Sequence, residues 1–207
     1  MYSPRHFAVE DLSLLDALFK RDAFVSLITI DAEGLPFASH VPVIYRRDGE
    51  RISIRGHWSR ANPQAHAAGP ALIIVHGPHG YVSPRWYTDP DQQVPTWNYA
   101  VAHLRGNLQS FDDAERLQSL VAELADAYEV PLGGDWRFPE SAPGRIDSLR
   151  GIIGFELQPS AIALKAKFNQ NHPEANRRGV IQALRQGDGH EQELADWMQR
   201  INFGNAE

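Results

Sequence analysis

Short apolar segments separated by tight turns run through most of this chain, and they constrain its fold more than any other feature. Asp48-Gly49 is a strong hairpin signal between two of them. The segments rich in β-branched and apolar residues are 23–30, 37–45, 51–58 and 71–75, followed by 81–86, 98–110, 151–157 and 162–168. Strands joined by turns rather than by repeated crossover helices form antiparallel sheets. We therefore predict a mainly β protein of the α+β class, with a closed or partly closed antiparallel barrel and helices on its flanks.

Helical periodicity is confined to a few segments. Leucines recur at helical spacing in residues 10–21 and 112–128, and Asp112 with Glu115 resembles a capping box. Pro173 opens a helix that a glycine pair near residue 188 ends, and a last helix follows. Residues 130–147 are rich in glycine and proline and are predicted to be a connector, while Pro42 indicates a sheet edge or a bulge. We expect a barrel domain over 1–168, including the helix at 112–128, and a helical extension over 169–207.

Composition excludes several classes of partner and of chemistry. The formal net charge of −6 over 207 residues gives no support for nonspecific attraction to nucleic acid or to an anionic membrane. The longest aliphatic run, 71–75, is far too short to span a bilayer, and the first residues lack the apolar stretch of a signal peptide, so we predict a cytoplasmic protein. The absence of cysteine excludes thiolate nucleophiles, iron–sulfur clusters and thiolate zinc sites.

The common catalytic motifs are missing. The chain has no GxGxxG, Walker-type or GxSxG motif, and His190-Glu191 does not continue as HExxH because position 194 is leucine. The nine histidines are scattered, which predicts no metal site. His40, His57 and His103 lie on predicted strands and are second-rank candidates for proton transfer.

Two aromatic stretches with interspersed prolines, GPHGYVSPRWY at 77–87 and VPTWNYAVAHLRG at 94–106, point to a ligand site. A flat amphipathic ligand needs rings against its face and polar groups at its edge. The alternative is an aromatic mini-core. The two stretches hold four large rings among hydrogen-bonding side chains: Trp86, Tyr87, Trp97 and Tyr99 with Ser83, Arg85, Thr96 and Asn98.

A third segment, GHWSRANPQ at 56–64, leaves a strand and enters a helix-like turn. Ser59 and Arg60 beside the free amides of that turn form a plausible phosphate anchor, because hydroxyl, guanidinium and backbone N–H all complement an anion. The alternative is a helix cap with a surface arginine. With the aromatic stretches, the segment suggests a ligand that has a phosphate at one end and a flat ring at the other.

These segments, in this order and spacing, closely resemble the PaiB family of the flavin-binding split-barrel group, which includes pyridoxamine-phosphate oxidases. The resemblance covers nearly the whole chain, and it departs at Asn169 and His172, where serine and arginine are expected, and at Ser59, where alanine is common. The matching segments are MYSPRHF at the start, LPFASHVPV at 35–43, the three stretches above, GIIGFEL at 151–157 and KAKFNQNHPEANRRGVIQAL at 165–184.

The resemblance implies a homodimeric split β-barrel that binds FMN at the dimer interface, and it carries the name of a negative transcriptional regulator. Arg60 and Ser59 then suit the phosphate, and Asn98 suits the pyrimidine edge of the flavin. The other residues carried over for the cofactor are His40, Trp86, Tyr87, Thr96 and Trp97, completed by Lys167, Gln170 and Asn171.

Three functions remain open from the sequence. The first is an FMN-binding negative transcriptional regulator that acts through the flavin or indirectly, since the acidic charge and the lack of a helix-turn-helix or zinc finger argue against direct DNA reading. The second is an FMN-dependent oxidoreductase acting on a small molecule, for which the sequence identifies no unmistakable acid or base. The third is a haem-binding or cofactor-free relative. The sequence does not name a substrate, an electron acceptor or a DNA target.

Overall fold

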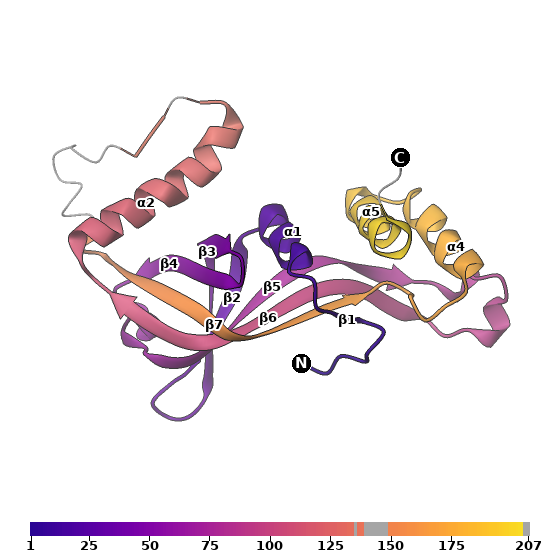
Figure 1. Cartoon of the computed structure of the whole chain (residues 1–207), viewed down its shortest axis with the longest axis horizontal. Helices are drawn as coiled ribbons and strands as arrows, with labels where there is room; N and C mark the ends of the chain where they lie inside the picture. The colour runs from indigo at the N-terminus through magenta and orange to yellow at the C-terminus, as the bar shows by residue number, and fades with distance from the viewer. Residues whose placement is uncertain (135, 139–148, 205–207) are drawn as a thin grey trace. The chain divides into compact units, whose positions relative to one another are not determined.

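The computed structural model describes residues 1–134, 136–138 and 149–204 (Figure 1). Three long strands, β5 (Gly69–Val82), β6 (Thr96–Phe111) and β7 (Ile152–Lys167), each contribute to two compact units. The first unit consists of Met1–Arg21, His76–Ala102 and Ala163–Glu207, and the second of Asp22–Val75 and His103–Ile162. The division between residues 168 and 169 stays a prediction.

Seven strands form one sheet. The remaining four are β1 (Ala8–Val9), β2 (Phe24–Ile30), β3 (Pro36–Asp48) and β4 (Arg51–Ser59), and the strand order is β1-β7-β4-β3-β2-β5-β6. An additional pairing between β7 and β6 joins the two sides of this order, so six strands form a closed ring. Neighbouring strands are antiparallel, from β2 with β3 to β4 with β7. The predicted antiparallel split β-barrel with flanking helices is confirmed.

Pro42 lies where β3 changes partner. Up to Pro42, which stands opposite Phe24, β3 pairs with β2, and from Val43, opposite Gly56, it pairs with β4. A proline has no N–H to donate to a sheet ladder. The change of partner accommodates Pro42 inside the sheet. In place of the predicted edge or bulge, β3 passes at Pro42 from pairing with β2 to pairing with β4.

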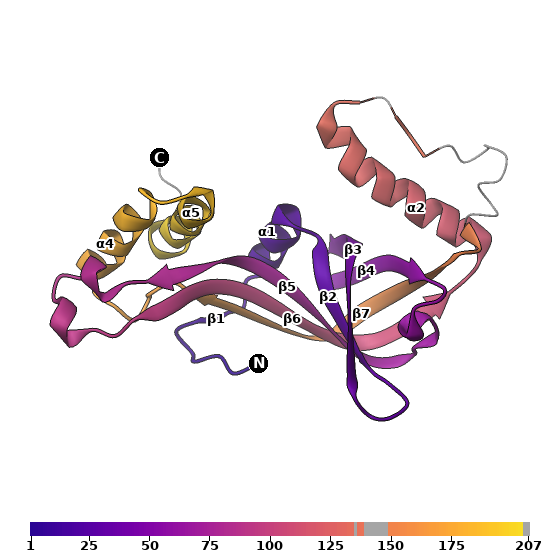
Figure 2. The ribbon, with the colours of Figure 1, turned by 180° about the vertical axis from the view of Figure 1, so that it is seen from behind.

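In the second unit, helix α2 (Ala114–Glu129) lies over β3 (Figure 2). Its Leu120 and Leu124 pack against Ile44, with Phe111 at the edge of the cluster. The side chain of Asp113 caps the helix by accepting a hydrogen bond from the backbone N–H of Arg116 at 2.8 Å. The predicted cap at Asp112 is therefore wrong by one residue.

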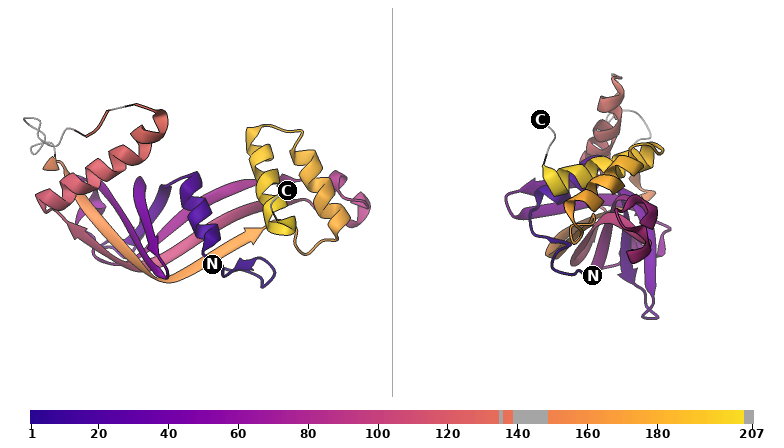
Figure 3. Two further views of the ribbon diagram at one scale, coloured as in Figure 1. Left: turned by 45° about the horizontal axis from the view of Figure 1, so that its top comes forward. Right: turned by 90° about the vertical axis from the view of Figure 1, so that its right-hand side faces the viewer.

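The first unit contains helices α1 (Ser13–Arg21), α4 (Glu174–Leu184) and α5 (Gly189–Phe203). Figure 3 shows α4 and α5 side by side. A capping box of Asp188 and Glu191 starts α5. Arg21 at the end of α1 donates two hydrogen bonds, of 2.7 and 2.9 Å, to the carboxylate of Glu193 on α5.

Four short 3-10 helices complete the described chain: η1 (Pro63–His66), η2 (Pro84–Trp86), η3 (Pro90–Gln92) and η4 (Val130–Leu132). The predicted strand over 81–86 is correct only for Tyr81 and Val82, because β5 ends at Val82 and the Ser83 hydroxyl accepts from the N–H of Arg85 to start η2. The two strands predicted at 151–157 and 162–168 form the single strand β7. Residues 135 and 139–147 of the predicted connector lie outside the described residues. No helix in the part of the chain that the structure describes is both long and apolar enough to cross a membrane.

Candidate functional site

One pocket gathers most of the sequence-predicted ligand residues of the first unit. It has a volume of about 210 Å³. We call it the Tyr87 pocket, and its lining residues are Phe7, Tyr87, Gln93, Val94, Thr96, Asn98, Lys167, Asn169, Asn171 and His172. They come from the N-terminus, from the residues after η2 and η3, from the start of β6 and from the end of β7, so four separate stretches of the chain build the site.

The aromatic wall of the pocket is formed by two stacked rings. The rings of Tyr87 and His172 lie nearly parallel, with 9° between their planes and 5.0 Å between their centroids. Helix α4 holds the segment that carries Tyr87, because the Asn176 side chain accepts from both the N–H and the hydroxyl of Thr88, at 3.0 and 2.8 Å. A helix of the same unit therefore holds the segment that carries the wall residue Tyr87.

The polar groups of the pocket come from alternate residues of β6. Successive side chains of a strand point to opposite faces, so Thr96 and Asn98 line the pocket and Trp97 does not. The Lys167 ammonium donates a hydrogen bond to the Thr96 hydroxyl. Asn98 is completely buried, and its Nδ2 donates to Asn169 Oδ1 and to the sulfur of Met198. Among the described residues its Oδ1 has no hydrogen-bond partner.

Burial and charge set the protonation of the two wall residues. Burial raises the pKa of Tyr87, and a hydrogen bond from Asn169 offsets part of this shift. Burial lowers the pKa of His172, and the charge of Lys167 lowers it further. At neutral pH the pocket thus presents a phenol and a neutral imidazole beside the ammonium of Lys167.

Asn169 occupies the turn at the end of β7 with a φ of 64°. Left-handed backbone is uncommon for residues other than glycine, although asparagine tolerates it best. The next residue, Gln170, closes the same turn: its Oε1 accepts from the N–H of Phe168 and its Nε2 donates to the carbonyl of Ala166. The structure therefore uses the predicted ligand residue Gln170 to shape the turn, while Asn171 lines the pocket.

The structure places two predicted aromatic residues away from the pocket lining. Trp97 is 54% exposed and lies near the rings of His79 and Tyr81, with centroids 6.3 and 6.2 Å away. Trp86 belongs to η2, and its backbone carbonyl faces Gly179 of α4. Of the two stretches singled out in the sequence, Tyr87, Val94, Thr96 and Asn98 line the pocket.

The predicted phosphate anchor belongs to the second unit. The Ser59 hydroxyl accepts from the N–H of Ala61, and Asn62 caps η1. The Arg60 guanidinium donates to the carbonyls of Arg150 and Ile152, at 2.8 and 3.4 Å, and lies 3.6 Å from the carboxylate of Asp112. These contacts use part of its five N–H donors and leave others for a ligand.

His40 also lies in the second unit. Its Nδ1 is 3.0 Å from the Ser26 hydroxyl, and its ring is tilted against Phe24. Both neighbours belong to the adjacent strand β2, and the His40 side chain is exposed.

Five lining residues of the Tyr87 pocket were not among the predicted cofactor contacts: Phe7, Gln93, Val94, Asn169 and His172. Phe7 precedes β1, and the pairing of Ala8 with Lys165 places it next to the end of β7. His172 differs from the residue expected by family resemblance, which is the only feature that draws attention to it. A two-residue strand has no readable periodicity, so no local pattern could have placed Phe7 at the site.

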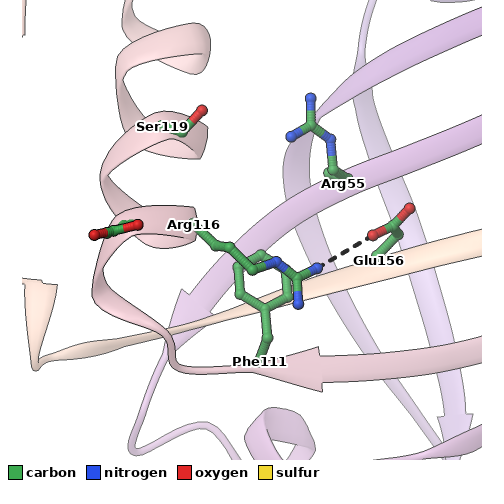
Figure 4. A pocket seen from close by; sticks show the side chains of 6 residues that line it. Arg55, Phe111, Arg116, Ser119 and Glu156 are labelled. Atoms are coloured by element: carbon green, nitrogen blue, oxygen red, sulfur yellow. Dashed lines mark hydrogen bonds and ion pairs between the residues drawn. The ribbon is translucent and has the colours of Figure 1, made fainter.

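A second and larger hollow, of about 470 Å³, lies in the second unit (Figure 4). Arg116 donates to Glu156 at 3.3 Å, and its guanidinium lies 3.9 Å from the centroid of the Phe111 ring. Arg55 donates two hydrogen bonds to Glu123, at 2.7 and 3.0 Å. Partial burial acts to raise the pKa of Glu123, but the hydrogen bonds and charges of Arg55 and Arg46 outweigh it and the pKa is lowered. Each arginine of this hollow has a carboxylate partner, which fits a structural ion-pair network.

His57 on β4 gives a pH-dependent prediction. Its Nδ1 is buried with no partner among the described residues, and burial lowers its pKa. The unfolded chain, with an ordinary histidine pKa of about 6.5, then binds the proton more tightly, so stability is lost as the pH falls below that value. We expect the urea concentration at the unfolding midpoint to decrease as the pH is lowered from about 7 to about 5. His57→Gln should make this midpoint depend less on pH. His190→Gln, at an exposed histidine, is the matched control, and an unchanged pH dependence in His57→Gln contradicts the prediction.

Comparisons with known sequences match most of the chain. A family described as "Putative FMN-binding domain" matches residues 1–161. The Protease synthase and sporulation protein PAI 2 of Bacillus subtilis (strain 168) is 29% identical over 188 residues, which covers 89% of this chain and 89% of that protein. The suspected resemblance is confirmed by both findings.

Solved structures share the fold at low sequence identity. The flavocytochrome Anf3 from Azotobacter vinelandii matches with a TM-score of 0.59 at 16% identity, over 80% of this chain and 72% of that one. The FAD and heme binding protein from Mycobacterium smegmatis matches with a TM-score of 0.53 at 19% identity, over 77% and 73%. At these identities the likeness concerns the fold alone.

Proposed function

Because this chain belongs to the FMN-binding domain family that matches residues 1–161, FMN is its cofactor, and we propose that the Tyr87 pocket binds the isoalloxazine ring. We propose further that the chain is a PaiB-like negative regulator of transcription that acts through its flavin or indirectly. The observation that carries the ring-binding proposal is the buried Oδ1 of Asn98, a lining residue of the Tyr87 pocket, which has no hydrogen-bond partner among the described residues.

The hydrogen-bonding groups that line the pocket complement those at the edge of a flavin ring. A buried acceptor without a partner is unfavourable, and it becomes satisfied when a ligand brings a donor to it. The pyrimidine edge of a flavin carries an N–H between two carbonyl groups. Asn98 supplies an acceptor for the N–H, and the Tyr87 hydroxyl and the Lys167 ammonium supply donors for the carbonyls. The stacked rings of Tyr87 and His172 give the apolar wall.

The size of the pocket supports a homodimer. Closed small-molecule sites usually measure about 300–1,000 Å³, whereas the Tyr87 pocket measures about 210 Å³. It therefore holds part of FMN, and further surface has to cover the rest. The family resemblance places the flavin at a dimer interface, so a second copy of the chain is the proposed source of that surface.

Arg60 and Ser59 are proposed to bind the phosphate of FMN. The remaining N–H donors of Arg60 can form charge-assisted hydrogen bonds to the phosphate, which carries roughly −1.5 to −2 charges at neutral pH. In a dimer the phosphate anchor and the ring pocket need not belong to the same copy of the chain. His40, Trp86, Trp97 and Gln170 remain proposed cofactor contacts because of the family resemblance.

The flavin supplies electron transfer when it is bound, and the chain supplies its orientation and electrostatics. Lys167 puts a positive charge at the pocket, which favours electron density on a bound ring. The phenol of Tyr87 holds its proton at neutral pH, since the ordinary phenol pKa is about 10 and burial raises the pKa of Tyr87 further. These two groups also support the second candidate function, an FMN-dependent oxidoreductase acting on a small molecule, since they place a proton and a cation at the redox site.

We expect apoprotein to bind FMN more tightly than FAD, because the anchor at Ser59 and Arg60 suits a terminal phosphate. Titration by flavin fluorescence measures both affinities. Arg60→Ala should weaken FMN binding by about tenfold or more, as the loss of charge-assisted hydrogen bonds predicts.

Light scattering of the FMN-loaded protein should give the mass of a dimer, twice the chain mass of 23.2 kDa. A monomer with FMN bound contradicts the proposed homodimer. The phosphate anchor at Ser59 and Arg60 is contradicted if FAD binds more tightly than FMN, or if Arg60→Ala leaves the FMN affinity unchanged.

We expect DNA binding by this acidic chain to be weak and indifferent to sequence, and to fade between ~50 and ~200 mM salt, as purely electrostatic contacts do. Over the same range of salt concentration, the reduced flavin in the FMN-loaded protein should still pass electrons to an acceptor. The absorbance of the flavin measures this reoxidation. Tight binding of one defined sequence at the higher salt, with random DNA ignored, would make a direct repressor the better interpretation.

A further inference from the structure

Four buried side chains form one continuous row of hydrogen bonds from helix α5 to the Tyr87 pocket. They are Met198, Asn98, Asn169 and Tyr87, whose exposed fractions are 0, 0, 3 and 5%. Asn98 Nδ2 lies 3.3 Å from the Met198 sulfur and also donates to Asn169 Oδ1. Asn169 Nδ2 lies 2.6 Å from the Tyr87 hydroxyl oxygen.

The chemistry of Met198 fixes the direction of this row. A thioether sulfur carries no proton and can only accept a hydrogen bond, so the amide nitrogen of Asn98 has to face it. The same nitrogen donates to Asn169 Oδ1, which turns Asn169 Nδ2 toward Tyr87. The Tyr87 oxygen therefore accepts within the row, and its own proton is free to point elsewhere.

We propose that Met198 and Asn169 are positioning residues that hold the Tyr87 hydroxyl as a hydrogen-bond donor toward the ligand of the pocket. The proposal rests on the proposed function and deepens it: the ligand presents an acceptor, a carbonyl oxygen or an unprotonated ring nitrogen, to Tyr87. Asn169 keeps a left-handed backbone, with φ of 64°, to reach both neighbours. Residues held in such sparsely populated conformations cluster at ligand sites.

The direction of the row can be tested without flavin. A donor to a phenol oxygen stabilises the phenolate, and an acceptor of the phenol proton stabilises the neutral form. Asn169→Gly keeps the positive φ and removes the amide, so it should raise the pKa of Tyr87. NMR titration of tyrosine labelled at Cζ measures this pKa, and Tyr87→Phe assigns the signal. A lowered Tyr87 pKa in Asn169→Gly means that the row runs the other way and overturns the proposal.

The role toward the ligand is tested by FMN affinity. In Asn169→Asp a carboxylate of the same shape replaces the donor, and the Tyr87 proton should turn to it and away from the ligand. We expect FMN affinity to fall about tenfold, as in Tyr87→Phe, and the double variant to be no weaker than Asn169→Asp alone. Asn171→Asp adds the same charge from an exposed side chain of the pocket, and its effect should add to that of Tyr87→Phe.

Met198→Leu completes the series. It keeps the apolar volume and removes the sulfur acceptor, so Asn98 loses the contact that sets its orientation. The pKa of Tyr87 should therefore rise, by less than it does in Asn169→Gly.

The outcomes separate the two proposals. Failure of wild-type protein to bind FMN contradicts the ring-binding function, while the Tyr87 titration still decides the direction of the row. If wild type binds FMN and the effects of Asn169→Asp and Tyr87→Phe simply add, the inference about Tyr87 is wrong and the ring-binding function stands.

Discussion

Replacing Gly179 with alanine is expected to destabilise the chain and to weaken FMN binding together. A Cβ at this position of α4 would lie 2.4 Å from the backbone carbonyl oxygen of Trp86. A backbone atom cannot rotate away, so α4 has to move from the segment that leads into Tyr87. Overpacking of this kind costs about 1–3 kcal/mol, which exceeds the gain of up to ~1 kcal/mol that alanine brings inside a helix. Urea unfolding and flavin titration measure the two effects.

Gly189→Ala is the matched control for this prediction. Gly189 starts α5, and a Cβ there would meet no atom within 4 Å. Its stability should stay level or rise by up to ~1 kcal/mol. Equal stability of the two alanine variants, with FMN binding unaffected, would show that α4 does not hold the Tyr87 segment in the way described.

Asn98→Ala should have a comparable effect from inside the pocket. Asn98 is completely buried and bonded to both Asn169 and Met198. Its removal leaves an unpaired buried acceptor on Asn169 and a small cavity, which together predict a loss of about 2–4 kcal/mol. FMN affinity should fall as well, because the acceptor proposed for the flavin N–H is gone.

Asn107 provides the control, since it is the same residue type on the same strand, β6, but is exposed. Asn107→Ala should change stability by at most ~0.5 kcal/mol. A similar loss in both variants would mean that β6 is sensitive to truncation in general and that the buried amide has no special part.

Most strands and helices could be predicted because their signals are local. Alternating apolar residues in β4 and the Asp48-Gly49 turn need no tertiary information, and neither does the leucine stripe of α2. The errors lie where elements meet. The strand predicted over 81–86 runs into a 3-10 helix that Ser83 caps, and the two strands predicted at 151–157 and 162–168 are one continuous strand, β7. Those outcomes depend on pairing with distant strands, which a local pattern does not contain.

The candidate site shows the same division at the level of single residues. The aromatic stretches pointed to Tyr87, Thr96 and Asn98, but strand alternation, counted from the observed start of β6, sends Trp97 to the other face. Gln170 stays a predicted ligand contact, and only the structure shows that its amide also bonds to the backbone of its own turn. A residue type states which bonds are possible, and the surrounding atoms decide which are made.

The sequence by itself determined the barrel class and the flavin-binding family, and it pointed to segments that line the candidate site, because these follow from local periodicity and from ordered motifs. Only the tertiary structure brought Phe7 and His172 to Tyr87 and set Met198 against Asn98. The physical reason is that a hydrogen bond has a direction and a short range. Met198 orients the amide of a residue 100 positions away in the chain, and that orientation exists only once the chain has folded.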